Sequence, residues 1–277
     1  MRTRLRPVAA RPITFLSDYG SDDEFAGVCR AVIAKIAPEA RVVDLTHGIR
    51  RHDVRDGAIA LANSLGFAPA GVHLAVVDPG VGSTRRPVAV RVAEEDRILV
   101  GPDNGLLSLA WDRLGGPQEA VDIATSKFRL EPASSTFHGR DLFAPVAASL
   151  ALGAELREAG EAIDTAVLTS LEIPAPRIWP DRIVAHVVRS DRFGNVALNV
   201  RHDDLAGGPV RLGEALTVES AGGQADAIFA RTFEEVGDGA LLLYEDSSRI
   251  LALAVNRGNA AEMLRLHRDD EVVLRPA

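Results

Sequence analysis

Several residue classes are scarce in this sequence of 277 residues, and each scarcity narrows what the protein is. Cys29 is the single cysteine, so no internal disulfide can form, and a reducing compartment such as the cytoplasm fits. No apolar run approaches the roughly 18 residues of a membrane-spanning helix. Aromatic residues make up 5% of the chain, so aliphatic side chains must fill a core that the 47% hydrophobic content can supply.

The sequence also lacks an excess of positive charge. It holds 31 Lys and Arg against 39 Asp and Glu, a formal net charge of −8. Proteins that bind polyanions usually present a basic field, so nucleic acid and anionic membranes are poor candidates for partners. Residues 1–11 are rich in Arg but have no apolar segment of a secretory signal, and we expect a loose tail there.

The first half of the chain alternates short apolar runs with helical periodicity. Strands are predicted at 13–16, 42–45 and 72–77, the last apolar enough for burial on both faces, and a hairpin at 88–92 and 98–100. A capping box from Ser21 to Glu24 predicts one helix start, and Asp53 predicts another, with Gly66 ending that helix. Further helices are expected at 106–114 and about 141–152. This alternation indicates an α/β domain, over residues 12–172, with a largely parallel sheet.

The second half differs in character. Three prolines within residues 171–180 have the composition of a linker. Short β-like runs follow at 183–188, 196–200, 215–218, 241–244, 250–255 and 271–274. They predict a smaller, β-rich domain over residues 181–277, either a sandwich or barrel-like.

Ligands of open α/β sheets bind beyond the carboxyl ends of the strands, so those ends are where chemistry is expected. Asp18 follows the first strand, where an acid can accept hydrogen bonds from sugar hydroxyls or simply cap a helix. Asp78-Pro79-Gly80-Val81-Gly82 follows the long apolar strand and leads to Arg85. This loop is either part of an active site or an ordinary turn with an Asp–Arg surface pair, and its position on a rigid strand favours the active site.

Two more segments are candidates in the first half. Asp103 and Asn104, in a turn after a strand, are weak ligand candidates. His138, Arg140 and Asp141 stand where a helix begins, which suits an oxygen-rich ligand, although the Arg and Asp can also pair with each other.

The metal-binding patterns are weak. The seven His show no zinc-binding pairing, so we expect no zinc site, and a magnesium site on Asp18 and Asp78 stays open. Cys29 lies in a helical pattern and is expected in the core.

Five motifs, in order, resemble the S-adenosyl-L-methionine (SAM) hydroxide adenosyltransferase family, or SAM hydrolases, which are related to the adenosyl-fluoride and adenosyl-chloride synthases. They are Phe-Leu-Ser-Asp-Tyr-Gly at 15–20, Asp-Pro-Gly-Val-Gly at 78–82, Gly-Pro-Asp-Asn-Gly at 101–105, Phe-His-Gly-Arg-Asp at 137–141 and Asp-Arg-Phe-Gly-Asn at 191–195. The resemblance covers residue 12 to the C-terminus.

The resemblance implies that SAM is the substrate, with no further cofactor and no metal, and that the products are adenosine and L-methionine. It implies a homotrimer with sites at subunit interfaces. The family's catalytic Asp, Arg and His fall on Asp78, Arg85 and His138. Its ribose-binding acid falls on Asp18, and its contacts with the methionine and adenine portions fall on Asp191 and Asn195. Further substrate contacts near the C-terminus fall on Ser247, Ser248, Val255 and Arg257.

These residue types suit water attack on the C5′ carbon of a sulfonium. Asp78 and His138 can orient or deprotonate a water while Arg85 stabilises hydroxide character, and either Asp78 or His138 can take the proton. One alternative is halide-dependent transfer that makes 5′-halo-5′-deoxyadenosine, although the acid at position 78 disfavours a halide pocket. The other is a regulator that binds SAM or adenosine without turnover.

Overall fold

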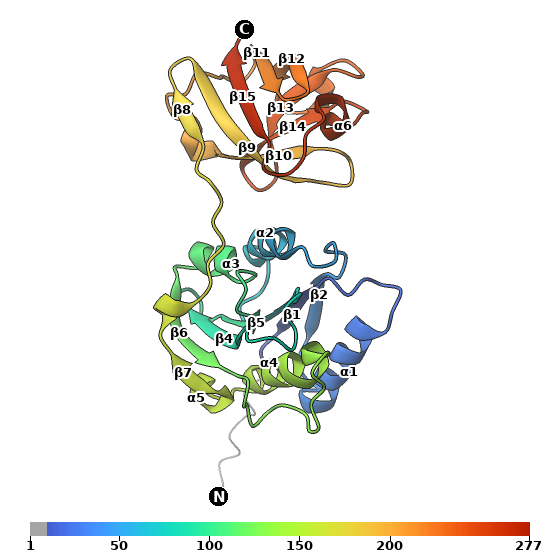
Figure 1. Ribbon diagram of the computed structural model, residues 1–277, viewed down its shortest axis with the longest axis vertical. Helices are drawn as coiled ribbons and strands as arrows, with labels where there is room; N and C mark the ends of the chain where they lie inside the picture. Colours follow the sequence, from blue (N-terminus) through green and yellow to red (C-terminus); the bar gives the residue numbers. More distant parts are fainter. Residues whose placement is uncertain (1–9) are drawn as a thin grey trace, which may run out of the picture. The chain divides into compact units, whose positions relative to one another are not determined.

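The computed structural model describes residues 10–277, so the tail expected at 1–11 lies almost wholly outside the described residues. The chain divides into two compact units, one ending at Leu171 and the other beginning at Glu172 (Figure 1). The segment with linker composition contains one short strand, β8 (Arg177–Trp179), which pairs with β9 (Arg182–Ser190) of the second unit. No helix among residues 10–277 is long and apolar enough to cross a membrane.

The first unit is an α/β domain built on one seven-stranded sheet. Its strand order is β2-β1-β3-β5-β4-β6-β7. The pairings of β1 with β2 and β3, and of β3 with β5, are parallel, while β4, β6 and β7 join in antiparallel fashion. The strands are β1 (Ile13–Ser17), β2 (Val42–Thr46), β3 (Val72–Val76), β4 (Pro87–Val92), β5 (Ile98–Pro102), β6 (Pro117–Asp122) and β7 (Glu161–Ile163). The prediction of a largely parallel sheet is confirmed.

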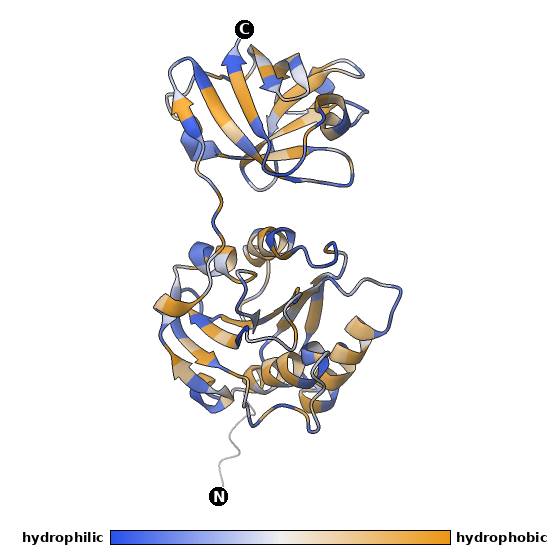
Figure 2. Ribbon diagram, in the orientation of Figure 1, coloured by the Kyte–Doolittle hydropathy of each residue, from blue (hydrophilic) through white to orange (hydrophobic). Residues whose placement is uncertain are grey.

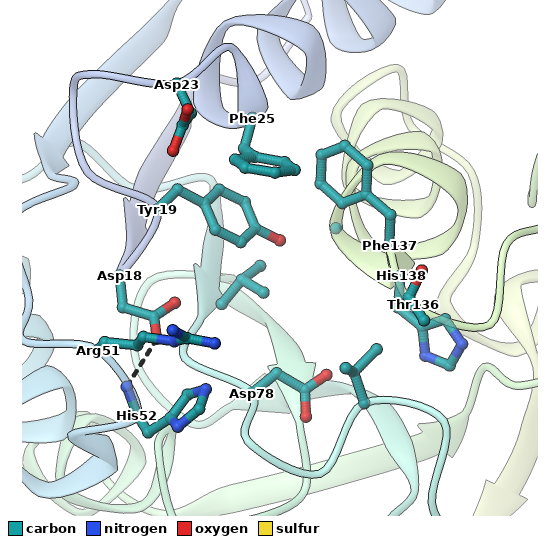
Figure 3. A pocket seen from close by; sticks show the side chains of 13 residues that line it. Asp18, Tyr19, Asp23, Phe25, Arg51, His52, Asp78, Thr136, Phe137 and His138 are labelled. Atoms are coloured by element: carbon teal, nitrogen blue, oxygen red, sulfur yellow. Dashed lines mark hydrogen bonds between the residues drawn. The ribbon is translucent and has the colours of Figure 1, made fainter.

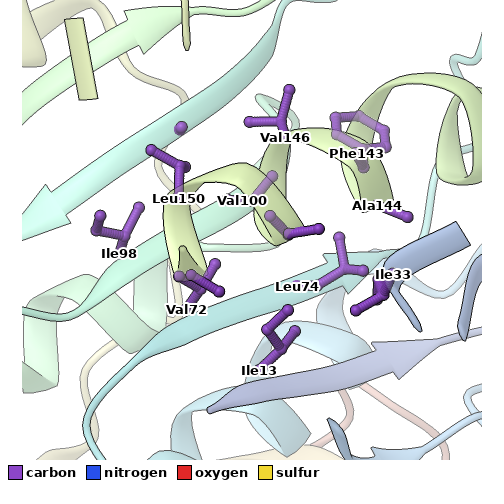
Figure 4. Close-up of a cluster of buried hydrophobic side chains, with 14 of the residues drawn as sticks. Ile13, Ile33, Val72, Leu74, Ile98, Val100, Phe143, Ala144, Val146 and Leu150 are labelled. Atoms are coloured by element: carbon purple, nitrogen blue, oxygen red, sulfur yellow. The ribbon is translucent and has the colours of Figure 1, made fainter. Parts of the chain in front are cut away.

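Helices cover both faces of this sheet. The helices are α1 (Phe25–Ile36), α2 (Val54–Leu65), α3 (Ser108–Arg113), α4 (Ala144–Ala151) and α5 (Leu156–Ala159), with a π-helical turn η1 (Gly139–Phe143) and a 3-10 turn η2 (Thr165–Val167). One core packs α1 and α4 against the strands, with Ile33, Leu74 and Val146 fully or almost fully buried (Figure 4). A second core packs α2 and α3 on the opposite face. Two apolar faces require strands that are apolar throughout, and the five residues of β3 are all buried.

Two helix starts test the capping predictions. Asp53 caps α2 as expected, because its side chain accepts a hydrogen bond from the Asp56 N–H. The Ser21 capping box is wrong: α1 begins after Glu24 without a side-chain cap, and the Ser21 hydroxyl donates instead to Asp22.

The second unit is a closed barrel of seven strands, which settles the choice between sandwich and barrel. Its order is β10-β14-β13-β12-β11-β15-β9, and the pairing of β10 with β9 closes the ring. The strands not yet given are β10 (Val196–Arg201), β11 (Ala215–Ser220), β12 (Gly223–Phe229), β13 (Leu241–Glu245), β14 (Ile250–Val255) and β15 (Glu271–Pro276). The 3-10 turns η3 (His202–Leu205) and η4 (Phe233–Glu235) and helix α6 (Ala260–Leu264) connect them. Inward-facing aliphatic residues fill the barrel, and its strands carry the apolar colours of Figure 2.

Candidate active site

A pocket of about 460 Å³ opens in the first unit beyond the carboxyl ends of β1 and β3 (Figure 3). Segments 18–25, 51–52, 76–81 and 136–139 supply its walls. Parallel strands bring their carboxyl ends to one edge of the sheet, which is why segments distant in sequence meet there. Asp18, Asp78 and His138, three of the residues predicted from sequence, all line this pocket.

Asp78, Arg85 and His138 form one connected group. Arg85 grips Asp78 with two parallel hydrogen bonds, from Nε to Oδ1 at 2.8 Å and from Nη2 to Oδ2. The same Nη2 lies 2.9 Å from Nδ1 of His138. The side chains of Asp78 and Arg85 are only 6% and 10% exposed, so this is no surface turn with a solvated ion pair. Paired hydrogen bonds between ions fix geometry as well as charge.

Glycine lets the Asp78 loop approach the His138 segment. Gly82 has φ +77°, and a Cβ there would lie 2.8 Å from the Ser135 carbonyl oxygen. Any side chain would therefore push the two loops apart. The Ser83 hydroxyl accepts a hydrogen bond from the Arg85 N–H at 3.2 Å, which tightens the turn that aims the guanidinium at Asp78.

Asp141 holds the segment that carries His138. This buried carboxylate accepts hydrogen bonds from the Ser134 N–H at 2.8 Å and from Nε of Arg140 at 2.6 Å. The Arg140 hydrogen bond is the main reason that the pKa of Asp141 lies below its ordinary value. The Arg–Asp pair considered from sequence is thus present, and it braces the loop before η1, next to His138 in the pocket lining.

The protonation of His138 follows from its surroundings. Burial lowers the pKa of His138, and the Arg85 charge lowers it further, against smaller opposing effects of Asp78 and Asp141. The imidazole is therefore neutral at pH 7. Because Arg85 donates to Nδ1, the ring's one proton resides on Nε2.

Asp18 follows β1 and is held by one hydrogen bond, from the His52 N–H to Oδ2 at 2.9 Å. His52 has a positive φ of 65°, which turns its N–H toward this carboxylate. Among the described residues Oδ1 of Asp18 makes no hydrogen bond, so it can accept from a ligand hydroxyl.

Sequence reasoning missed several pocket residues. Asp23, Phe25, Arg51 and His52 line the pocket and are not among the site residues predicted from sequence. The only sequence signal for Arg51 and His52 was that they follow β2, whose carboxyl end lies at the same edge of the sheet as those of β1 and β3.

Asp103 and Asn104 have structural roles. Asp103 is buried, pairs with Arg86 at 3.0 Å and accepts from the Thr169 N–H at 2.7 Å. Asn104 donates to the Val77 carbonyl at 2.9 Å and so braces the end of β3 that leads to Asp78.

In the barrel unit, Asp191 and Asn195 shape the loop between β9 and β10. Oδ1 of Asp191 accepts from the N–H groups of Phe193 and Asn195 at 2.8 and 3.0 Å, and Oδ2 accepts from Nδ2 of Asn195 at 2.9 Å. The loop presents Phe193, whose ring is 63% exposed, with the Arg192 guanidinium 4.7 Å from its centre.

The four substrate contacts predicted near the C-terminus differ in exposure and in hydrogen bonding. Ser247 is exposed, and the Ser248 N–H donates to Asp246 in the turn between β13 and β14. The side chain of Val255 is buried in the barrel core, while Arg257 is exposed and pairs with Asp238 at 3.1 Å. Nothing in this geometry tests whether these four residues contact a substrate.

No group of three or more His, Cys, Asp or Glu is placed to hold a metal ion within residues 10–277. The magnesium site considered on Asp18 and Asp78 has one carboxylate already matched to a guanidinium. Cys29 is buried in the core as expected, and burial raises the pKa of its thiol to about 12.

Comparison with known proteins gives matches to both units. Residues 13–160 match a family model described as the SAM hydroxide adenosyltransferase N-terminal domain, and residues 185–273 match the corresponding C-terminal domain. Two relatives named (R)-S-adenosyl-L-methionine hydrolase are 44% identical (Salinispora tropica; 94% of this chain, 96% of the relative) and 40% identical (Thermus thermophilus; 92% and 96%). A protein named fluorinase from Nocardia brasiliensis is 28% identical over 91% of this chain and 92% of its own.

Solved structures show the same fold. The crystal structure of an uncharacterized conserved protein from Thermotoga maritima has a TM-score of 0.87 and 34% identity, covering 95% of this chain and 99% of its own. That of a conserved hypothetical protein from Thermus thermophilus has a TM-score of 0.75 and 39% identity, with the same coverage.

Proposed function

Since this chain belongs to the SAM hydroxide adenosyltransferase family and is a SAM hydrolase, we propose that Asp78, Arg85 and His138 form the group that activates its water. The observation that supports this assignment most is the Asp78–Arg85–His138 group beside a pocket at the strand ends. The overall reaction converts SAM and water to adenosine, L-methionine and a proton.

The step that the group must assist is an in-line displacement at C5′. The water oxygen forms a bond to C5′, the C5′–S bond breaks, and sulfur keeps the electron pair as a neutral thioether. Sulfonium is already a good leaving group, so the protein's task is to orient a nucleophile and take its proton. Positioning of this kind can remove about 7–11 kcal/mol of barrier, and proton transfer can add ~10²–10⁴-fold in rate.

The hydrogen bonds divide the roles within the group. Nδ1 of His138 is occupied by Arg85, and Nε2 carries the proton, so His138 acts as a donor to the water oxygen as hydroxide character develops. Asp78 takes the proton, because each carboxylate oxygen keeps a lone pair beyond the one used for Arg85. Arg85 holds both partners and supplies positive charge where the nucleophile becomes anionic.

We propose that Asp18 binds the ribose hydroxyls, with its free Oδ1 as acceptor and its Oδ2 fixed by His52. Asp191 and Asn195 are proposed to contact the methionine and adenine portions, with Ser247, Ser248, Val255 and Arg257 as further contacts. These proposals rest on the motif order.

A homotrimer and a cytoplasmic location are likewise proposals, together with the division into domains at 12–172 and 181–277. Sedimentation of the purified protein tests the trimer directly. A monomer that hydrolyses SAM at full rate would contradict it.

A halide-dependent transferase is the rival activity, and the fluorinase relatives make it worth testing. The buried carboxylate of Asp78 disfavours it, since a halide beside that carboxylate would meet like charge. The purified enzyme is incubated with SAM alone and with added chloride or fluoride, and the products are separated by chromatography. Adenosine and methionine are expected in every case; a 5′-halo-5′-deoxyadenosine would refute the assignment.

The same assay tests the roles of individual residues. Asp78→Asn should reduce kcat by about 10²–10⁴-fold, since it removes the proton acceptor. Asp103→Asn is the matched control, because it alters another buried aspartate that pairs with an arginine, Arg86, outside the pocket. A normal rate for Asp78→Asn, or equal losses of kcat in both variants, would overturn the role given to Asp78.

A further inference from the structure

Three aromatic rings form one wall of the pocket. Tyr19, Phe25 and Phe137 pack together with ring centres 5.9 Å (Tyr19–Phe25), 5.8 Å (Tyr19–Phe137) and 5.1 Å (Phe25–Phe137) apart. Figure 3 shows them grouped above Asp78, on the other side of the space that the pocket residues surround. In a chain with only 5% aromatic residues, this concentration is unusual.

Packing within the chain leaves part of Phe25 uncovered. Its side chain is 39% exposed in the first turn of α1, and it is outside the hydrophobic core that Tyr19 and Phe137 join at their buried sides. Its contacts with Tyr19 and Phe137 cover part of the ring, and because Phe25 lines the pocket, the part left exposed is available to a ligand.

The charges around these rings favour a cation. Three carboxylates line the pocket, Asp18, Asp23 and Asp78, against the single guanidinium of Arg51, and Asp78 is paired with Arg85. Neither Asp18 nor Asp23 forms an ion pair with Arg51 or with another Lys or Arg among residues 10–277. The Arg140 guanidinium already lies over Phe137, 5.0 Å from the ring centre. Over Tyr19 and Phe25 no Lys or Arg is found in the described part of the chain, so their faces are available. Burial raises the pKa of Tyr19 well above its ordinary value, so this ring stays neutral.

We propose that Tyr19 and Phe25 recognise the sulfonium of SAM by cation–π attraction, and that they select it over neutral thioethers. This inference rests on the proposed function. A sulfonium is a weakly hydrated cation of the kind that aromatic faces attract. When the C5′–S bond breaks, sulfur becomes neutral and the attraction is lost, so the rings favour substrate binding and release of methionine. They aid binding specificity, and the rate of the chemical step must come from the Asp78 group.

Stacking on the adenine base is the other use of such rings, and the geometry excludes a base held between two of them. The planes of Tyr19 and Phe25 are tilted by 44°, and Phe137 stands at 82° to both, so no two rings are parallel. A flat base between them would meet at most one face. Base stacking would also act equally on SAM and on its thioether analogue, which gives the experiment its discrimination.

The test compares cationic and neutral ligands in wild type, Phe25→Leu and Phe25→Trp. Titration calorimetry gives Kd for sinefungin, which carries an ammonium at the sulfonium position, and for the neutral thioether S-adenosylhomocysteine. Initial rates give kcat and KM for SAM. Phe67→Leu is the matched control, because Phe67 is 90% exposed and lies outside the pocket.

Phe25→Leu should weaken sinefungin and raise KM for SAM by roughly 2- to 30-fold, with S-adenosylhomocysteine changed far less. Phe25→Trp should keep or increase the preference for the cation, and Phe67→Leu should change nothing. Equal losses for cation and thioether would show apolar packing or base stacking instead, and unchanged binding of all ligands would show that the ring has no part; either result overturns the inference. Failure of wild type to hydrolyse SAM would refute the proposed function alone, because the ratio of the two dissociation constants is measured without turnover.

Discussion

Replacing Gly139 by alanine tests how closely the pocket wall is fitted to His138. Gly139 is buried at the first position of η1, directly after His138. A Cβ there would lie 2.0 Å from the hydroxyl oxygen of Tyr19, 3.0 Å from its Cζ and 3.3 Å from its Cε2. A separation of 2.0 Å does not occur between real non-bonded atoms, so either the Tyr19 ring or the His138 backbone must move. Phe15, Phe25 and Phe137 surround the ring and restrict its movement.

We expect Gly139→Ala to lose about 1–3 kcal/mol of folding free energy, the usual range for overpacking. For a unit of this size that corresponds to a fall in Tm of roughly 2–12 °C. The value of kcat should fall by more than tenfold, since a displacement of His138 by about 1 Å can reduce rates ~10²-fold. The double variant Tyr19→Phe/Gly139→Ala removes the worst contact and should recover part of both losses.

Differential scanning fluorimetry and initial rates with SAM measure the two effects. Gly66→Ala is the control, because a Cβ at Gly66 has no atom within 4 Å and its backbone is helical. A Gly139→Ala variant with the Tm and kcat of wild type would refute the reasoning. So would a double variant no better than the single one.

Three further outcomes are expected. Arg85→Lys should reduce kcat by ~10²-fold, as an ammonium cannot reproduce the paired hydrogen bonds to Asp78; a loss under threefold would contradict this. Burial and Arg85 lower the pKa of His138, so the acid limb of kcat/KM should lie below pH 6.5 and move upward in Arg85→Met; an acid limb at or above pH 6.5 in wild type would contradict it. Burial also lowers the pKa of His73 to about 3, below the value near 6.5 in the unfolded chain. The unfolded chain therefore binds the proton more readily, and stability should fall as pH drops from about 6.5 toward 3, by on the order of 5 kcal/mol in full. Urea unfolding of His73→Gln should show a shallower loss, and an identical acid slope in both proteins would be inconsistent with this account.

The parts of the fold that were predictable are those that near neighbours in sequence determine. The apolar run before Asp78 is β3, and the Asp53 cap begins α2, because burial on both faces and a free helix N–H each leave a local pattern. Strands β6 and β12 were missed, since their sequences begin with Pro117 and Gly223 and mix small and charged residues. Tertiary pairing overrides weak propensity in such strands. The prediction that Ser21 caps a helix was also wrong. The local motif is present, but α1 begins after Glu24 and the Ser21 hydroxyl bonds to Asp22 instead.

The sequence by itself determined the α/β character of the first half, the β-rich second half, the absence of an internal disulfide and, through five ordered motifs, the family. The loop 78–85 was already marked by its address after a buried strand. The tertiary structure decided what that loop does, because Arg85 and His138 are 53 positions apart and meet only through the parallel sheet. It likewise decided the tautomer of His138, the closed barrel, and the ring cluster of Tyr19, Phe25 and Phe137. Each of these depends on long-range packing, which leaves no periodic signal along the chain.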